Sequence, residues 1–248
     1  MERLLEVCID SLASARAAIR GGADRIELCS ALALGGLTPY TGLLRQIRAE
    51  SDIPVRCLMR LRSGDFLYCQ DEIDLMAAQI RELKSAGANG FVIGCLTAEG
   101  ALDAAAMKPL IKAASGAGLT LHRCIDVSRN PLETYRCAAS LGFDTVLTSG
   151  AAASCTQGLG MLAQLLQLRD SENGPEVLIG AGVNPSNVRQ LLAALPNAAA
   201  FHASCKELVE SRMVFRREDV PMGLPGFDEW HVQQTCEANV RELKEMLS

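Results

Sequence analysis

The stretch Gly22-Ala23-Asp24-Arg25-Ile26-Glu27-Leu28-Cys29 contains the unit that decides the fold of this 248-residue chain. A helix-like segment ends at its glycine, and a short polar turn leads into an apolar strand. Glycine is favoured just past a helix because the left-handed conformation there is costly for residues with a Cβ. The same order of helix, glycine and strand recurs at 87–94 and at 142–148. It is typical of the αβ loop in a chain of β/α repeats.

Eight strand candidates alternate with eight helix candidates. The strands are expected at 4–9, 25–29, 55–60, 91–95, 119–124, 145–148, 177–180 and 200–204. The helices are expected at 11–20, 40–50, 71–86, 103–116, 131–140, 159–169, 185–195 and 228–247. This alternation and the length predict a (β/α)8 TIM barrel. A doubly wound open sheet is the alternative, although it usually has fewer strands at this length.

We expect a single domain over residues 1–248, in which 206–248 supplies a loop and a last helix that complete the barrel. Residues 207–227 show no clear period and are expected to form a long loop. The net charge of −5 and the absence of a run rich in lysine or arginine argue against nucleic acid as a partner. No apolar run is long enough to span a bilayer, and no signal-peptide pattern is found, so a cytoplasmic protein is expected.

The ten cysteines are scattered and form no Cys-x-x-Cys motif. A zinc knuckle and a thioredoxin motif are therefore not expected. A chain of this size can fold without disulfides, so we expect most of the cysteines to be reduced and to pack as small apolar residues.

Alternation along the strands predicts which side chains enter the barrel. Ile26 and Leu28 share a face and must pack against helices, so Glu27 and Cys29 point inward. The same argument gives an inward set near the carboxyl ends of the strands, consisting of Glu6, Cys8, Glu27, Cys29, Arg60, His122, Cys124, His202 and Ser204. Such charges need partners, because burying an unpaired charge is costly. A buried network that only fills the barrel is one interpretation, but convergence on the face where barrel active sites lie favours a site.

Three strand ends carry further polar groups. The third strand is followed by Arg60-Leu61-Arg62-Ser63-Gly64-Asp65-Phe66, whose two guanidinium groups suit a carboxylate or a phosphate. The seventh is followed by the glycine-rich 179–187, where the next helix could present free N–H groups to an anion. The candidate anion-binding residues are Arg62, Asp65, Arg123, Thr148, Ser149, Gly180, Gly182 and Ser204. His231, in the expected last helix, is predicted to pack or to face solvent.

Seven blocks along the chain together resemble the copper homeostasis protein CutC family. They are Leu5-Glu6-Val7-Cys8, Gly21 to Cys29, Gly35-Gly36-Leu37-Thr38-Pro39, Arg60-x-Arg62-x-Gly64-Asp65-Phe66, His122-Arg123-x-x-Asp126, Leu147-Thr148-Ser149-Gly150 and Phe201-His202-x-Ser204. They follow the family's order from about residue 5 to 204. The resemblance implies a cytoplasmic TIM barrel connected with copper tolerance and with Cu(I) binding. The chain departs from the family pattern at Tyr40, Leu61, Leu121 and Cys124, and of these Tyr40 and Cys124 are expected to reshape the pocket.

Two hypotheses of function follow. In the first, soft thiolates of Cys8, Cys29 and Cys124 bind Cu(I), the one cofactor considered. In the second, a metal-independent enzyme acts on a small anion, with Glu6, Glu27 and His122 as acid or base groups. The candidate catalytic residues of the second hypothesis are Glu6, Glu27, Arg60, His122, Asp126 and His202. The expected partners are a copper ion or a small anion, and the chain is expected to form a homo-oligomer.

Overall fold

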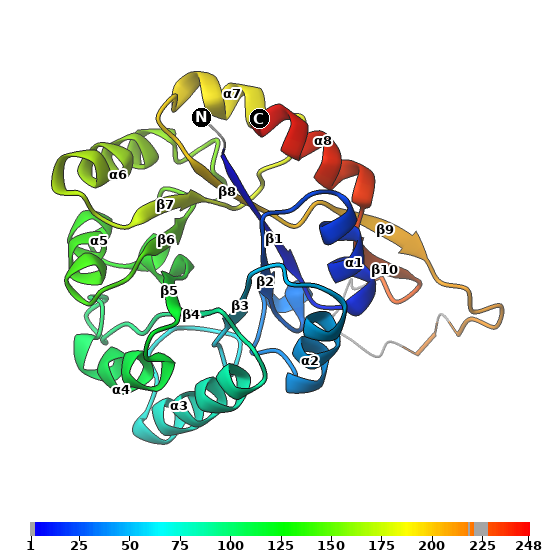
Figure 1. The fold of residues 1–248 in the computed structure, drawn as a ribbon, viewed down its shortest axis with the longest axis horizontal. Coiled ribbons are helices and arrows are strands. Elements are labelled where there is room, and N and C mark those ends of the chain that lie inside the picture. The colour runs from blue at the N-terminus through cyan, green and yellow to red at the C-terminus, as the bar shows by residue number, and fades with distance from the viewer. Residues whose placement is uncertain (1–2, 218, 221–227) are drawn as a thin grey trace.

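The computed structural model describes residues 3–217, 219–220 and 228–248, and its centre is a closed barrel of eight parallel strands (Figure 1). The strands are β1 (Leu4–Ile9), β2 (Arg25–Leu28), β3 (Val55–Leu58), β4 (Gly90–Ile93), β5 (Gly118–Leu121), β6 (Thr145–Thr148), β7 (Glu176–Ile179) and β8 (Ala200–Ala203). They pair in chain order, and β8 closes the barrel against β1 with His202 opposite Glu6. The predicted (β/α)8 TIM barrel is thereby confirmed.

Helices surround the barrel (Figure 1). They are α1 (Leu12–Arg20), α2 (Thr41–Glu50), α3 (Gln70–Ser85), α4 (Ala104–Ala114), α5 (Pro131–Ser140), α6 (Leu159–Glu172), α7 (Val188–Ala194) and α8 (Glu237–Leu247), with short 3-10 turns η1 (Leu32–Leu34) and η2 (Arg123–Val127). The last helix, α8, packs against α7, α1 and β1. It closes the ring between the first and the last repeat.

The turn that defines the repeat has two structural roles. Its glycine has a positive φ in each copy, at Gly22 (90°), Gly87 (102°) and Gly142 (83°). The polar residue two positions later accepts the amide of the neighbouring strand, with bonds of 2.7–2.9 Å from Leu5 to Asp24, from Val55 to Asn89 and from Leu119 to Asp144. This turn therefore reverses the direction of the chain and also fixes the start of the adjacent strand.

The main core lies between the strands and the helices. Leu5, Val7, Ile26 and Leu28 are fully buried there, as the alternation predicted. Burying each such side chain stabilises the fold by about 1.5–3 kcal/mol. The opposite faces of the same strands are left for the polar groups that enter the barrel.

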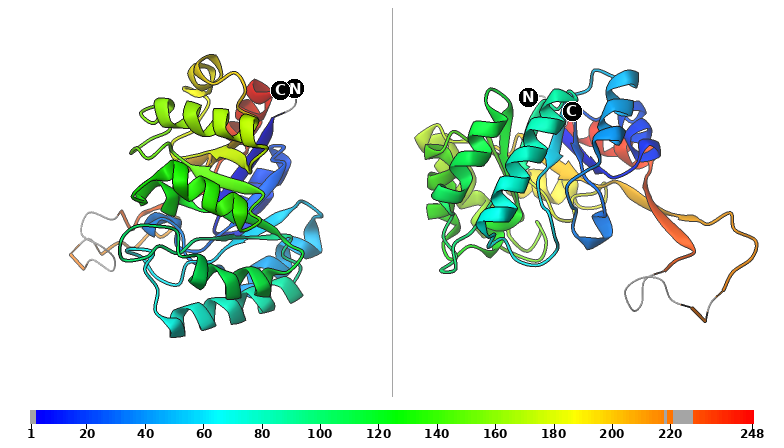
Figure 2. Two further views of the ribbon diagram at one scale, coloured as in Figure 1. Left: turned by 90° about the vertical axis from the view of Figure 1, so that its left-hand side faces the viewer. Right: turned by 90° about the horizontal axis from the view of Figure 1, so that it is seen from below.

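The region after β8 differs from the prediction of a long loop and a helix from 228. The chain forms two strands, β9 (Lys206–Glu210) and β10 (His231–Thr235), which pair antiparallel with Val209 opposite Val232. We call this pair the β9–β10 ribbon, and it projects away from the barrel (Figure 2). The helix begins only at Glu237, because the 231–235 segment places alternate residues on opposite faces of a two-stranded ladder.

His231 consequently lies in a strand and not in a helix. Residues 218 and 221–227 of the predicted loop lie outside the described residues. Across the ranges that the structure describes, no helix has the length and apolar character needed to cross a bilayer.

Candidate functional site

A cavity of about 1320 Å³ opens at the carboxyl ends of the barrel strands and continues beside the β9–β10 ribbon. Its wall combines residues that the sequence placed in one site, namely Cys8, Glu27, Arg60, His122, His202 and Ser204. Active sites of TIM barrels lie at this face of the fold. Side chains from five different strands or strand ends therefore meet where chemistry is expected.

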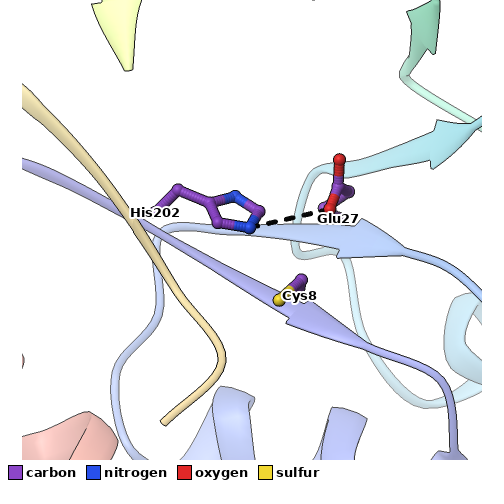
Figure 3. Close-up of side chains that lie close together, drawn as sticks. All are labelled: Cys8, Glu27 and His202. Carbon is purple, nitrogen blue, oxygen red and sulfur yellow. Dashed lines mark ion pairs between the residues drawn. The ribbon is translucent and has the colours of Figure 1, made fainter. Parts of the chain in front are cut away.

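Cys8, Glu27 and His202 form a compact cluster in this cavity (Figure 3). One sulfur, one carboxylate oxygen and one imidazole nitrogen from these residues lie within 4.8 Å of one another. All three residues are at most 9% exposed, and His202 Nε2 lies 3.7 Å from Glu27 Oε2. They come from the neighbouring strands β8, β1 and β2, so the barrel itself sets their spacing.

Glu6 and Arg25 bind to the cluster through the other nitrogen of the His202 ring, with Glu6 between His202 and Arg25. Glu6 is fully buried, and its Oε1 accepts a 2.9 Å hydrogen bond from His202 Nδ1, while Arg25 Nε donates to its other oxygen. Burial opposes ionisation of Glu6, but the bond from His202 and the charge of Arg25 prevail and lower its pKa to about 2. A carboxylate on one imidazole nitrogen orients the ring so that the other nitrogen faces the cavity.

Arg25 is a functional candidate that the sequence reasoning missed. It is the first residue of β2 and shares the inward face with Glu27, so the alternation rule applied to the strand start would have found it.

The residues of the cluster shift one another's pKa values. Burial disfavours the imidazolium of His202, but Cys8, Glu27 and Glu6 around it raise its pKa well above the ordinary value. Burial raises the pKa of Glu27, an effect that His202 opposes and Glu6 reinforces. A metal ion bound here would displace the protons of its ligand groups, the imidazolium proton of His202 among them.

The other two candidate thiols, Cys29 and Cys124, are not members of the cluster. Cys29 Sγ is 3.5 Å from Glu27 Oε2, so it borders the cluster, and burial and Glu27 raise its pKa well above the ordinary value. Cys124 packs next to His122, where a Cβ on Gly94 would come within 2.5 Å of its sulfur. Burial and Cys95 raise its pKa as well. The structure therefore brings Cys29, but not Cys124, next to Glu27 of the cluster.

His122 and Arg60 form a second polar corner of the cavity. His122 Nδ1 accepts the amide of Cys124 at 3.1 Å, which leaves the proton of the neutral ring on Nε2. Within the described part of the chain, His122 Nε2 and Arg60 Nε are buried without a hydrogen-bond partner. Burial and the charge of Arg60 lower the pKa of His122 to about 3. The ring of Phe66 contacts both, at 4.7 Å from the His122 centroid and 5.3 Å from Arg60 Cζ.

Several other candidate residues are engaged in holding loops. Arg62 bonds to Glu72, Asp65 and the Leu67 carbonyl, so neither Arg62 nor Asp65 is free toward the cavity. Asp126 lines the cavity, but its carboxylate accepts bonds from Arg123 Nε, from the Thr148 and Ser149 hydroxyls, and from the Ser149 and Ala151 amides. These bonds fix the η2 turn and the end of β6 to each other.

The glycine-rich segment after β7 differs from the expectation. The helix α7 begins at Val188 and not at 185, and it has only seven residues. The Gly182 carbonyl accepts the side-chain amides of Asn184 and Asn187, and the Asn184 oxygen accepts the Ser186 amide. The polar groups of this loop satisfy one another, so the anion site predicted at Gly180 and Gly182 has no helix N-terminus to complete it.

Phe66 is a second functional candidate that the sequence reasoning missed, although it belongs to the polar loop after the third strand. An aromatic residue in a polar loop was the available signal. What the sequence could not provide is its contact with both Arg60 and His122.

The fold and the site together define a TIM-barrel protein with a polar site at the carboxyl ends of its strands. The CutC family model matches residues 3–207, and the chain belongs to that family. A family protein CutC of Chromobacterium violaceum is 41% identical over 100% of this chain and 99% of its own length. The human copper homeostasis protein cutC homolog is 38% identical over 97% of this chain and 87% of its own.

Solved structures agree with this family. The crystal structure of CutC from Streptococcus agalactiae superposes with a TM-score of 0.76 at 25% identity, covering 82% of this chain and 98% of that one. Thiamine phosphate pyrophosphorylase from Pyrococcus furiosus gives a TM-score of 0.55 at 16% identity and covers 99% of this chain and 95% of that one. The second likeness shows the shared barrel fold alone.

Proposed function

We propose that this protein acts in copper homeostasis and binds a copper ion through Cys8 and His202, with Glu27 as a third ligand. The observation that carries the proposal is the cluster itself, whose three donor atoms lie within 4.8 Å of one another. The names of the human and mouse relatives, both copper homeostasis protein cutC homologs, support copper as the metal. A thiolate and an imidazole are ligands that copper accepts readily.

The surroundings of the cluster support a metal site rather than a simple buried network. Glu6 holds His202 through Nδ1, which is the arrangement of a carboxylate behind a metal-ligating histidine. Arg25 already forms an ion pair with Glu6. A cation bound at Cys8 and His202 therefore does not need Glu6 as a ligand. Cys29, beside Glu27, offers a second thiol to Cu(I), the softer oxidation state.

Titration of Cu(I) against a chromogenic chelator, under reducing and oxygen-free conditions, tests the proposal. We expect the wild-type chain to bind one equivalent, and Cys8→Ser to bind it at least tenfold more weakly. Cys69→Ser is the matched control, because Cys69 is an exposed cysteine at the start of α3 and should not change the affinity. The double variant Cys8→Ser/Cys29→Ser decides the matter, and unchanged affinity in it would reject the proposal.

We also propose that the protein works in the cytoplasm as a homo-oligomer that uses the β9–β10 ribbon as a contact surface. Leu208, Val209 and Val232 are 65%, 38% and 59% exposed on this ribbon. Exposed apolar strands with free edges are prone to pair with another chain. A second copy of this chain would present the same ribbon, as a two-fold symmetric dimer requires.

A further inference from the structure

The corner formed by Arg60, His122 and Phe66 does not belong to the copper cluster. Its two unpartnered nitrogens are both donors and both buried, whereas buried polar groups in proteins nearly always have partners. The two residues belong to different segments, after β3 and after β5, and both line the large cavity. Two unpartnered donors on one cavity, both on side chains that contact the Phe66 ring, point to an acceptor that enters from the cavity.

The charge of the corner is positive and is not balanced by a protein carboxylate. Arg60 bonds through its terminal nitrogens to the carbonyl oxygens of Leu34, Gly36 and Gly64, which carry no charge. Among the described residues, no carboxylate lies within ion-pair distance of Arg60. These carbonyl bonds fix the guanidinium in place and leave Nε–H as the group still to be satisfied. An anionic ligand would supply the missing charge.

The number of donors distinguishes between anions. Arg60 Nε–H and the Nε2–H of neutral His122 are two N–H groups, which match the two oxygens of a carboxylate. Phosphate has more acceptor oxygens and usually takes helix N-termini or several backbone amides as well. The turn that starts at this corner, η2, has its Cys124 amide already bound to His122 Nδ1. Leu58, Leu147 and Phe66 are apolar residues that line the same cavity, so the rest of the ligand should be apolar.

We propose that the Arg60–His122 corner binds the carboxylate of a small organic acid with an apolar body. Arg60 Nε–H and His122 Nε2–H donate to its two oxygens, while the body packs on Leu58 and Leu147. Phe66 is half-buried on the loop after β3 and lies against both donors, so its side chain rotates to admit the carboxylate. The site is separate from the copper cluster, and the inference does not depend on copper binding.

Benzoate is the probe that tests this proposal, with its binding to the chelator-treated full chain measured by calorimetry. We expect saturable binding of benzoate, and neither benzamide nor inorganic phosphate should displace it. Cys8→Ser should bind benzoate as the wild type does, which separates this result from the outcome of the copper test. Equal binding of benzamide, tighter binding of phosphate, or no binding of benzoate would overturn the proposal.

Two substitutions of His122 distinguish the role of its Nδ1 acceptor from that of its Nε2 donor. His122→Asn keeps an acceptor for the Cys124 amide and removes the Nε2 donor, so benzoate should bind about 10- to 100-fold more weakly. His122→Gln places an amide N–H near the Nε2 position and should retain most of the affinity. His231→Asn is the control, since His231 lines the far end of the same cavity and pairs with Asp228.

Ring NMR of the wild-type protein provides a measurement that does not depend on any variant folding. The Nε2 resonance of His122 should shift on addition of benzoate and stay unchanged with benzamide. Equal affinity of the Asn and Gln variants, or a His122 ring that does not respond to benzoate, would refute the proposed carboxylate site.

Discussion

At the scale of single residues, His122 shows how burial decides a protonation state. Burial and the charge of Arg60 lower its pKa to about 3, against about 6.5 for a free histidine. The unfolded chain therefore binds one more proton than the folded chain between pH 3 and 6.5. The contribution of neutral His122 to the free energy of unfolding is fully present above pH 6.5. It is lost as the pH falls toward 3.

We predict that this loss amounts to about 3–5 kcal/mol, and that the ring stays neutral with its proton on Nε2 down to pH 4.5. Nitrogen chemical shifts of the histidine ring will report the protonation state, and urea unfolding at several pH values will report the stability. The His122→Asn variant should lack this part of the pH dependence. A ring that titrates with a midpoint above pH 5 would contradict the prediction.

Arg25 and Glu6 allow a second prediction at this scale. Arg25 is 8% exposed and pairs with the fully buried Glu6, so Arg25→Met leaves a buried carboxylate without its guanidinium. We expect a loss of about 3–5 kcal/mol in the free energy of unfolding, measured by chemical denaturation. Arg16→Met is the matched control, because Arg16 and Glu50 form an exposed ion pair and should change stability little. Similar effects of both substitutions would show that burial does not strengthen the inner pair.

The residues show how far the sequence could predict the site. Alternation in short apolar strands was enough to place Glu6, Glu27 and His202 inside the barrel, because a side chain can point only to one of two faces. It did not reveal that Glu6 is held by Arg25 and His202, since such pairs depend on the register between strands. Nor could it show that Arg62 bonds to Glu72 on α3, since that contact depends on the path of a loop.

At the scale of elements, the close approach of β4 to the end of β5 shapes the second corner of the cavity. A Cβ on Gly94 would lie 2.5 Å from Cys124 Sγ and 2.6 Å from His122 Cε1, which real side chains do not tolerate. Gly94→Ala should therefore destabilise the protein by about 1–3 kcal/mol and displace the His122 ring. Thermal unfolding and the ring resonances measure the two effects.

Gly42→Ala serves as the control for that substitution. Gly42 lies in α2, where an added Cβ would have nothing within 4 Å, and alanine favours the helix by about 0.5–1 kcal/mol. If Gly94→Ala were as stable as Gly42→Ala, the packing of β4 against His122 would not be as tight as described.

Some elements could be predicted from a local sequence pattern and others could not. The eight barrel strands were predicted because three repeats carry the glycine turn and each repeat carries an apolar strand, so the evidence is local. The β9–β10 ribbon has no such turn at its ends. Its strands are separated by 20 residues and are mostly exposed, so no apolar face marked them as strands.

At the scale of the whole molecule, the cavity combines two sets of groups with opposite preferences. One wall holds the thiol, imidazole and carboxylate of Cys8, His202 and Glu27, which suit a cation. The other holds the donors of Arg60 and His122, which suit an anion. A single cavity of about 1320 Å³ can accept both, so a bound carboxylate and a bound metal ion would not exclude each other by volume alone.

The β9–β10 ribbon carries the last prediction, which concerns assembly. Val209 and Val232 face each other across the ribbon and are both exposed, so a second ribbon could cover them. The double variant Val209→Lys/Val232→Lys places like charges on this face and should shift the chain to a monomer in sedimentation velocity, with an unchanged circular dichroism spectrum. Leu75→Lys, at an exposed apolar position on α3, is the control and should keep the wild-type mass. A wild-type chain that sediments as a monomer, or a double variant that keeps the wild-type mass, would show that the ribbon does not hold an oligomer together.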